Sequence, residues 1–207
     1  MPPIHHMLYR CPLCGHDPMV RSSRRAECQS CGTIFERGRG STILVRKPGD
    51  PTRASTATEL IGGVAVMAEE SLGERTEASA PIHQAQVSLG RAEGQDTVRF
   101  KGHVLGFSER IKQEGEGLLR LYSDRLIWCA KGGDPVDWPF DVIRAIQISS
   151  RAIQVRFLRC GLRQFEFLED SPKRWEDLFR LALQRFYAAR GEIIVEFQPQ
   201  IVTESLP

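Results

Sequence analysis

The sequence of 207 residues contains 41% hydrophobic and 26% charged residues and has a formal net charge of +2. This apolar content is enough for a folded core and argues against a wholly disordered chain. A net charge so close to zero excludes a strongly basic nucleic-acid coat protein and a strongly acidic tail protein. Because domains commonly hold about 100–150 residues, the length suits one ordinary domain and a smaller module.

Charge is unevenly distributed along the chain. Residues 1–50 hold 8 Lys and Arg against 4 Asp and Glu, residues 51–98 hold 3 against 7, and residues 99–207 hold 17 against 15. The middle stretch is rich in Ala, Ser, Thr, Gly and Glu and has no aromatic residue before residue 98. We therefore predict four regions along the chain. They are a small module (1–47), a flexible acidic linker (48–97) with one weak helix near Thr58–Ser71, a globular domain (98–198) and a tail (199–207).

The sequence start indicates the compartment. The opening MPPIHHMLYRCPLC has no apolar region behind a basic one, and the longest apolar stretch, Leu60–Ala68, is about half of a bilayer span. We therefore expect a cytoplasmic protein without a signal peptide, in which cysteines stay reduced and paired cysteines favour metal binding over disulfides.

Four of the six cysteines form two C-x-x-C-G motifs, with thirteen residues between Cys14 and Cys28. Two intervening residues let both thiolates of one turn reach a single ion, and a second such turn completes a tetrahedron. The glycine after each pair removes a side chain where the chain folds back. Four thiolates leave no coordination position for an activated water, so the predicted site is structural. Its ligands are Cys11, Cys14, Cys28 and Cys31.

The region around the cysteines favours short strands, in a hairpin within Met19–Glu27 and at Thr33–Glu36 and Thr42–Arg46. Together with the doubled C-x-x-C-G, this resembles the zinc-ribbon family with rubredoxin-like knuckles over roughly the first 46 residues. The resemblance implies a structural Zn²⁺ ion, with iron in the same four-thiolate site as the alternative. The nearby histidines are interpreted as solvated residues: His5, His6 and His16.

From Val98 onward the sequence predicts short antiparallel strands followed by one helix. Alternation is clear in the segment where Ile153, Val155 and Phe157 fall on one face. Ser171 is a good helix N-cap, and an apolar stripe follows it up to Gly191. This pattern predicts a seven-stranded barrel capped by a C-terminal α-helix. The predicted strands are Val98–Phe107, Gly117–Tyr122, Arg125–Ala130, Val136–Phe140, Ile143–Ile148, Ala152–Leu158 and Arg163–Leu168.

The run GLLRLYSDRLIW, residues 117–128, is similar to the signature of GRAM and bacterial pleckstrin-homology (PH) domains. Tyr122 and Ser123 depart from the usual Leu-Thr or Val-Thr, and Trp128 replaces the usual Phe. The expected fold class is thus mainly β, with an N-terminal zinc ribbon and a PH-like seven-stranded barrel capped by one helix. We expect Trp128 and Trp138 in its core or at the barrel rim.

Lipid-binding members of this family use basic residues on the first two strands and the loop between them. The corresponding residues here are Lys101, Arg110, Lys112 and Arg120. Three carboxylates in the same region oppose an anionic headgroup: Glu109, Glu114 and Glu116. The resemblance therefore favours a protein partner over an anionic membrane.

No catalytic motif is present: the sequence has no G-x-S-x-G, P-loop, H-E-x-x-H or dinucleotide-binding glycine motif. We predict no catalytic residue and a non-catalytic two-module adaptor that binds a protein partner. One alternative is a nucleic-acid-associated factor, with Arg21, Arg24 and Arg25 on phosphates. The second alternative is a peripheral membrane scaffold. Outside the motifs, Cys129 is interpreted as a small buried thiol, and Glu192–Phe197 as an eighth strand or a tail.

Overall fold

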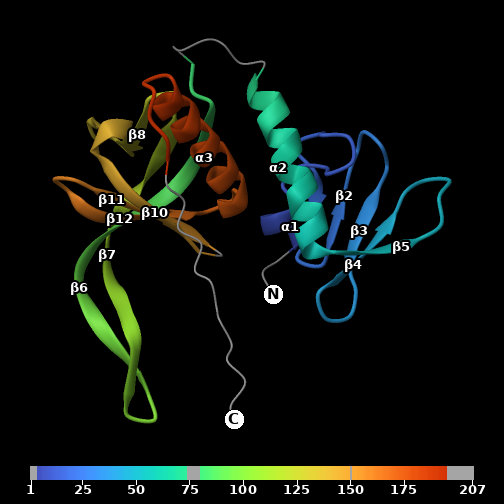
Figure 1. The fold of residues 1–207 in the computed structure, drawn as a ribbon, viewed down its shortest axis with the longest axis horizontal. Coiled ribbons are helices and arrows are strands. Elements are labelled where there is room, and N and C mark those ends of the chain that lie inside the picture. Colours follow the sequence, from blue (N-terminus) through green and yellow to red (C-terminus); the bar gives the residue numbers. More distant parts are fainter. Residues whose placement is uncertain (1–3, 74–79, 150, 195–207) are drawn as a thin grey trace.

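The computed structural model describes residues 4–73, 80–149 and 151–194, which form two antiparallel sheets, each with its own hydrophobic core (Figure 1). The first sheet has the strand order β1-β2-β3-β4-β5. Its unit comprises α1 (Ile4–Met7), β1 (Val20–Arg21), β2 (Arg25–Glu27), β3 (Ile34–Arg37), β4 (Thr42–Arg46), β5 (Arg53–Thr56) and α2 (Ala57–Gly73).

The second sheet has seven strands in the order β10-β11-β12-β6-β7-β8-β9, followed by the C-terminal helix α3. Its elements are β6 (His83–Phe100), β7 (His103–Leu121), β8 (Arg125–Ala130), β9 (Pro135–Pro139), the 3₁₀ turn η1 (Phe140–Val142), β10 (Ile143–Ile148), β11 (Ala152–Phe157), β12 (Gly161–Phe167) and α3 (Pro172–Ala188). The prediction of a mainly β chain with a C-terminal helix is confirmed.

The prediction of a closed barrel is wrong, because β9 and β10 are the two edges of an open sheet. The turn η1 separates these strands, and helix α3 covers the core between them. The buried ring of Phe140 packs against Phe179 and Phe186 of α3, with centroids 5.6 and 5.3 Å apart. Tyr187 also donates a hydrogen bond to the Phe140 carbonyl, at 3.2 Å. Side-chain packing therefore completes this core where a barrel would use strand pairing.

Residues 48–97 differ from the expected flexible linker, since they contain β5, α2 and most of β6. The α2 helix begins with a capping box: Thr56 Oγ1 accepts from the Glu59 N–H, and Glu59 accepts from the Thr56 N–H. Leu60, Val64 and Ala68 then bury one face of α2 in the core of the first unit. The expected weak helix is thus a full helix that belongs to the cysteine-containing unit.

The predicted strand Val98–Phe107 is instead the end of a hairpin, because the chain reverses at Lys101 and Gly102. Both residues have positive φ, 48° and 84°, as a two-residue hairpin turn requires. The reversal joins β6 to β7, and the predicted strand Gly117–Tyr122 is only the last part of β7. The first strand of this sheet begins at His83, fifteen residues before the expected boundary.

The remaining strand predictions agree closely with the structure. The bounds of β4, β8 and β10 match, and β3, β9, β11 and β12 differ from expectation by one or two residues. Trp128 and Trp138 are buried in the core of the second unit, as expected. The expected strand Glu192–Phe197 lies partly outside the described residues, and the tail 199–207 lies wholly outside them. Within the described ranges, no helix combines the length and apolar character needed to cross a membrane.

The two units touch through their helices, with α1 and α2 of the first packed against α3 of the second (Figure 1). The far ends of β6 and β7 form a hairpin that projects from the second sheet, away from the rest of the fold (Figure 1).

Candidate metal centre and adjoining pocket

Two chain reversals with the same hydrogen-bond pattern present the four cysteines. In the first, the Gly15 N–H donates to the Cys11 carbonyl at 2.9 Å, and the Cys11 N–H donates to the His16 carbonyl at 2.9 Å. In the second, Gly32 bonds to Cys28 at 2.8 Å, and Cys28 bonds to Thr33 at 2.9 Å. Gly15 and Gly32 have φ of 72° and 69°, so each glycine occupies a conformation that other residues rarely adopt. Both reversals are therefore knuckles of the kind predicted from the motif.

The four thiols converge on one point, although Cys11 and Cys28 are seventeen residues apart in the chain. The Sγ atoms of Cys11 and Cys31 are 3.8 Å apart, those of Cys14 and Cys28 are 3.5 Å apart, and all four lie within 4.8 Å of one another. None of the four is in a disulfide. The predicted cluster is confirmed: these cysteines lie close enough together to bind one metal ion. His16 is not part of this group of ligands.

The thiols occupy contrasting environments. Burial raises the pKa of the Cys11 and Cys28 thiols above the ordinary value. Burial acts in the same direction on Cys31, but hydrogen bonds from the Thr33 hydroxyl and N–H outweigh it and lower its pKa to about 6. A thiolate is the metal-binding form of cysteine, so the hydrogen bonds from Thr33 favour the ligand form of Cys31.

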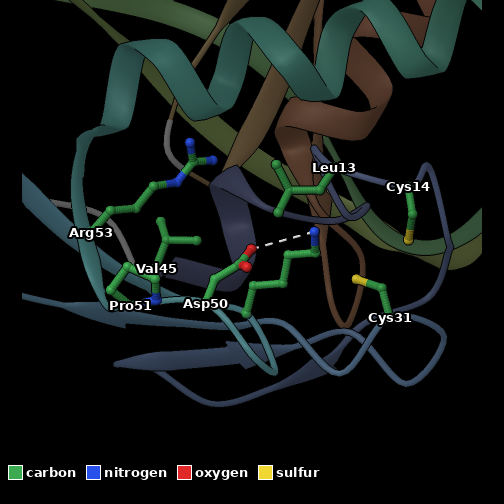
Figure 2. Close-up of a pocket in the computed structure, with 8 residues that line it drawn as sticks. Leu13, Cys14, Cys31, Val45, Asp50, Pro51 and Arg53 are labelled. Atoms are coloured by element: carbon green, nitrogen blue, oxygen red, sulfur yellow. Dashed lines mark ion pairs between the residues drawn. The ribbon is translucent and has the colours of Figure 1, made fainter.

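A pocket of about 400 Å³ opens beside the cluster (Figure 2). The sulfur atoms of Cys14 and Cys31 lie at one end, and Arg53 and Pro51 lie at the other (Figure 2). Lys47 Nζ forms an ion pair with Asp50 at 3.4 Å. The lining thus combines apolar surface with two cations and one carboxylate. The full set of lining residues is Leu13, Cys14, Cys31, Val45, Lys47, Asp50, Pro51 and Arg53.

Residues on either side of the first knuckle attach the candidate metal centre to helix α3. The Tyr9 hydroxyl donates to Asp177 at 3.0 Å, and Arg174 Nη2 contacts Asp17 Oδ1 at 2.5 Å. The Arg174 guanidinium also lies over the Tyr9 ring, 5.1 Å from its centroid. No local motif in the sequence indicates these four residues as contacts, because they lie far apart in the chain.

The arginines proposed as phosphate contacts lie on the β1–β2 hairpin. Arg25 forms an ion pair with Glu27 at 2.8 Å, and its Cα is paired in register with Glu36 of β3. Arg24 is exposed, and the side chain of Arg21 lies outside the described part of the structure. Carboxylates therefore lie beside Arg25, and phosphate binding stays a prediction.

The structure separates the four residues proposed as lipid contacts. Lys101 lies at the turn of the β6–β7 hairpin, whereas Arg110 and Lys112 form ion pairs with Asp96 and Glu93, at 2.8 and 3.3 Å. Arg120 is half-buried within the sheet, in the part of β7 that pairs with β8. These residues do not form one cationic site.

The two cysteines outside the motifs are unpaired and far from the cluster in sequence. Cys129 is half-buried in β8, where it was expected to be buried, and Cys160 is exposed in the turn before β12.

In comparisons with known proteins, no protein-family model matches the chain, and no curated protein matches it.

Proposed function

We propose that the chain is a non-catalytic binding protein of the adaptor type, in which a zinc-stabilised module presents the pocket beside its cysteines to a segment of a partner protein. One observation carries the proposal: the two metal knuckles form a wall of that pocket, through Leu13, Cys14 and Cys31. An ion that fixes the knuckles would therefore also fix the shape of the pocket.

We propose zinc as the ion held by this site. Four thiolates around zinc, at about 2.3 Å each, place neighbouring sulfurs about 3.8 Å apart in a tetrahedron. The Sγ separations of 3.8 and 3.5 Å across the cluster fit this geometry. When bound, zinc would cross-link the knuckles and contribute to the free energy of folding of the module. This geometry supports the zinc-ribbon interpretation of the first unit.

We further propose that the second unit is PH-like. Two features support this interpretation: seven antiparallel strands precede a single C-terminal helix, and that helix covers the core between the edge strands. In this proposal the second unit acts as a platform. The contacts between α3 and the cysteine-containing unit hold the pocket in a fixed position relative to the second unit.

The chemistry of the pocket indicates the class of partner segment. Leu13 and Pro51 offer apolar surface, and Lys47 and Arg53 supply two cations against the single carboxylate of Asp50. A short peptide that combines an apolar side chain with an acidic one would complement both features. Because the lining includes knuckle residues, binding of such a peptide should require the metal.

The test is a peptide-display selection against the zinc-loaded full chain, followed by affinity measurements on the selected peptides. We expect acidic-apolar peptides whose affinity falls at least about tenfold in Arg53→Glu, since a loss of about 1.4 kcal/mol is tenfold in Kd. Arg159→Glu is the matched control, because Arg159 is an exposed arginine on the other unit. The proposal is contradicted if no peptide is selected, or if affinity is insensitive to both Arg53→Glu and removal of the metal.

A further inference from the structure

The β6–β7 hairpin extends well beyond the sheet that holds it (Figure 1). Strand β12 pairs with β6 only as far as Arg91, and β8 pairs with β7 only from Gly117. Beyond the Ala92–Ile111 pair, the two strands therefore pair only with each other. At about 3.4 Å per residue, the arm from residue 92 to residue 100 reaches roughly 30 Å beyond the sheet.

The end of this hairpin carries large apolar side chains in open solvent. Phe100, Leu105 and Phe107 are 60%, 66% and 68% exposed, and Val98 and Val104 are exposed beside them. We call residues 98–107 the hairpin tip. Scattered exposed apolar residues are ordinary on protein surfaces, but five within ten residues form a concentrated apolar surface of the kind that marks an interaction site.

The apolar side chains of the hairpin tip lie on both faces of the two-stranded ribbon. Val98 and Phe100 share one face because they are two residues apart on β6. Phe107 is directly opposite Thr97 in the register, which places Phe107 on the other face. A docking surface on a folded protein would contact one face of such a ribbon. A tip with large apolar side chains on both faces instead suits a medium that surrounds it, such as the interior of a lipid layer.

The charges of the hairpin tip complement an anionic surface. Between Asp96 and Glu109 the sequence has two cations, Arg99 and Lys101, and no carboxylate. Lys101 Nζ lies 5.4 Å from the centroid of the Phe100 ring, and Arg99 donates to the Gly102 carbonyl at 3.5 Å. Neither cation has an ion pair among the described residues.

Two of the three carboxylates that oppose lipid binding, Glu109 and Glu114, lie in the stem of the hairpin, between the sheet and the tip, and basic partners accompany them. Glu109 pairs with Arg156 at 3.7 Å and accepts from Gln95 at 2.8 Å. Glu114 pairs with Arg91 at 3.5 Å and with Arg163 at 3.9 Å. The stem charges are therefore largely compensated in place, and the uncompensated charge at the far end is positive.

We propose that the hairpin tip inserts into the surface of an anionic lipid bilayer, with Phe100, Leu105 and Phe107 among the acyl chains and Arg99 and Lys101 at the phosphate level. The only property required of the headgroup is its negative charge, which Arg99 and Lys101 complement. This inference goes beyond the proposed peptide-binding pocket and uses a different part of the chain, so either proposal can fail without the other.

The test is co-sedimentation of the zinc-loaded full chain with vesicles of phosphatidylcholine alone or mixed with phosphatidylserine. We expect partition onto the mixed vesicles, reduced at least about tenfold by Phe100→Ser/Phe107→Ser. Arg99→Gln/Lys101→Gln should lower binding about fivefold per charge. Leu158→Ser is the matched control, because Leu158 is 56% exposed on the same unit but lies away from the hairpin tip.

Circular dichroism and size-exclusion chromatography of each variant separate insertion from its alternatives. Native-like spectra for the tip variants confirm that any lost binding reflects the tip. Three results would overturn the proposal: no partition of the native chain onto anionic vesicles, equal partition of Phe100→Ser/Phe107→Ser, or a dimer that only the tip variants dissociate. The last result would assign the hairpin tip to contact with a second copy.

Discussion

The Tyr9 hydroxyl donates a 3.0 Å hydrogen bond to Asp177 Oδ2, a residue 168 positions further along the chain. Both side chains are buried, and Lys173 Nζ contacts the other carboxylate oxygen at 2.8 Å. Burial, followed by the neighbouring Asp177 carboxylate, raises the pKa of Tyr9, so the phenol stays a donor. This hydrogen bond joins the segment before the first cysteine to helix α3 and couples the two units.

Replacing Tyr9 by Phe removes the donor and leaves the buried Asp177 carboxylate with Lys173 alone. We expect the free energy of unfolding to fall by about 1–3 kcal/mol, the usual cost of an unsatisfied buried polar group. Urea unfolding followed by tryptophan fluorescence measures it. Tyr122→Phe is the control, since the Tyr122 hydroxyl has no hydrogen-bond partner among the described residues. Equal effects of the two substitutions would contradict the role of this contact.

The Arg174–Asp17 ion pair should contribute more than an exposed pair, because both side chains are partly buried between the units. A double-mutant cycle with Asp17→Asn and Arg174→Gln should give a coupling energy of about 1–3 kcal/mol. The comparison cycle uses Arg110 and Asp96, which are 2.8 Å apart but well exposed. That pair should couple by about 0.2–1 kcal/mol. A larger coupling for the exposed pair would contradict a fixed arrangement of the two units.

Stability should depend on pH through Asp170, whose Oδ2 lies 2.6 Å from His83 Nε2 and accepts from the Trp175 indole N–H at 2.8 Å. Burial alone would raise its pKa, but the His83 hydrogen bond and the Arg174 charge outweigh burial, and the pKa of Asp170 lies below its ordinary value. A carboxyl group with a lowered folded-state pKa stabilises the protein above its unfolded pKa of about 3.9. This contribution disappears as the pH falls through the folded-state pKa.

Asp170→Asn should therefore lower the free energy of unfolding by about 1.5–3 kcal/mol near neutral pH. The difference from the native chain should begin to shrink below about pH 4, where the unfolded-state carboxyl binds a proton, and should disappear as the pH falls through the lower folded-state pKa. Unfolding curves from about pH 3 to 7 measure this difference. Asp134→Asn, at an exposed carboxylate, should show neither effect. A difference that stays constant or grows below about pH 4 would be inconsistent with the assigned role of Asp170.

Cys28→Ser should unfold the cysteine-containing unit, because structural zinc sites contribute apparent binding energies of about 10–16 kcal/mol. This exceeds or equals the whole stability of many small domains, about 5–15 kcal/mol. We expect the amide NMR signals of residues 8–46 to collapse while those of β8 to β12 persist. Cys160→Ser, at an exposed cysteine outside the cluster, is the control. Unchanged signals for residues 8–46 in Cys28→Ser would refute this expectation.

Local patterns in the sequence predicted much of this structure. The two C-x-x-C-G motifs determine both knuckles because each is complete within five residues. Alternation of Ile153, Val155 and Phe157 was sufficient for β11, and the Ser171 N-cap marks the start of α3, where its side chain accepts from the Arg174 N–H. Each of these elements is specified by residues close together in the chain.

The missed features depend on weaker or longer-range signals. The first part of β6 alternates Ala85, Val87 and Leu89 with polar residues, but small and polar side chains concealed the pattern. The reversal at Lys101 and Gly102 lies inside an apolar run. The sequence pattern therefore indicates a continuous strand where the structure has a turn. The contact between Tyr9 and Asp177 joins residues that no spacing rule relates, so only the folded chain reveals it.

Cobalt titration of the metal-free full chain tests the central claim, that Cys11, Cys14, Cys28 and Cys31 hold one structural metal ion. We predict one equivalent of Co²⁺ with the absorption spectrum of a tetrahedral four-thiolate site, complete displacement by Zn²⁺, and loss of this spectrum in Cys31→Ser. A spectrum of another geometry, or four thiols that remain fully reactive in the presence of Zn²⁺, would contradict it.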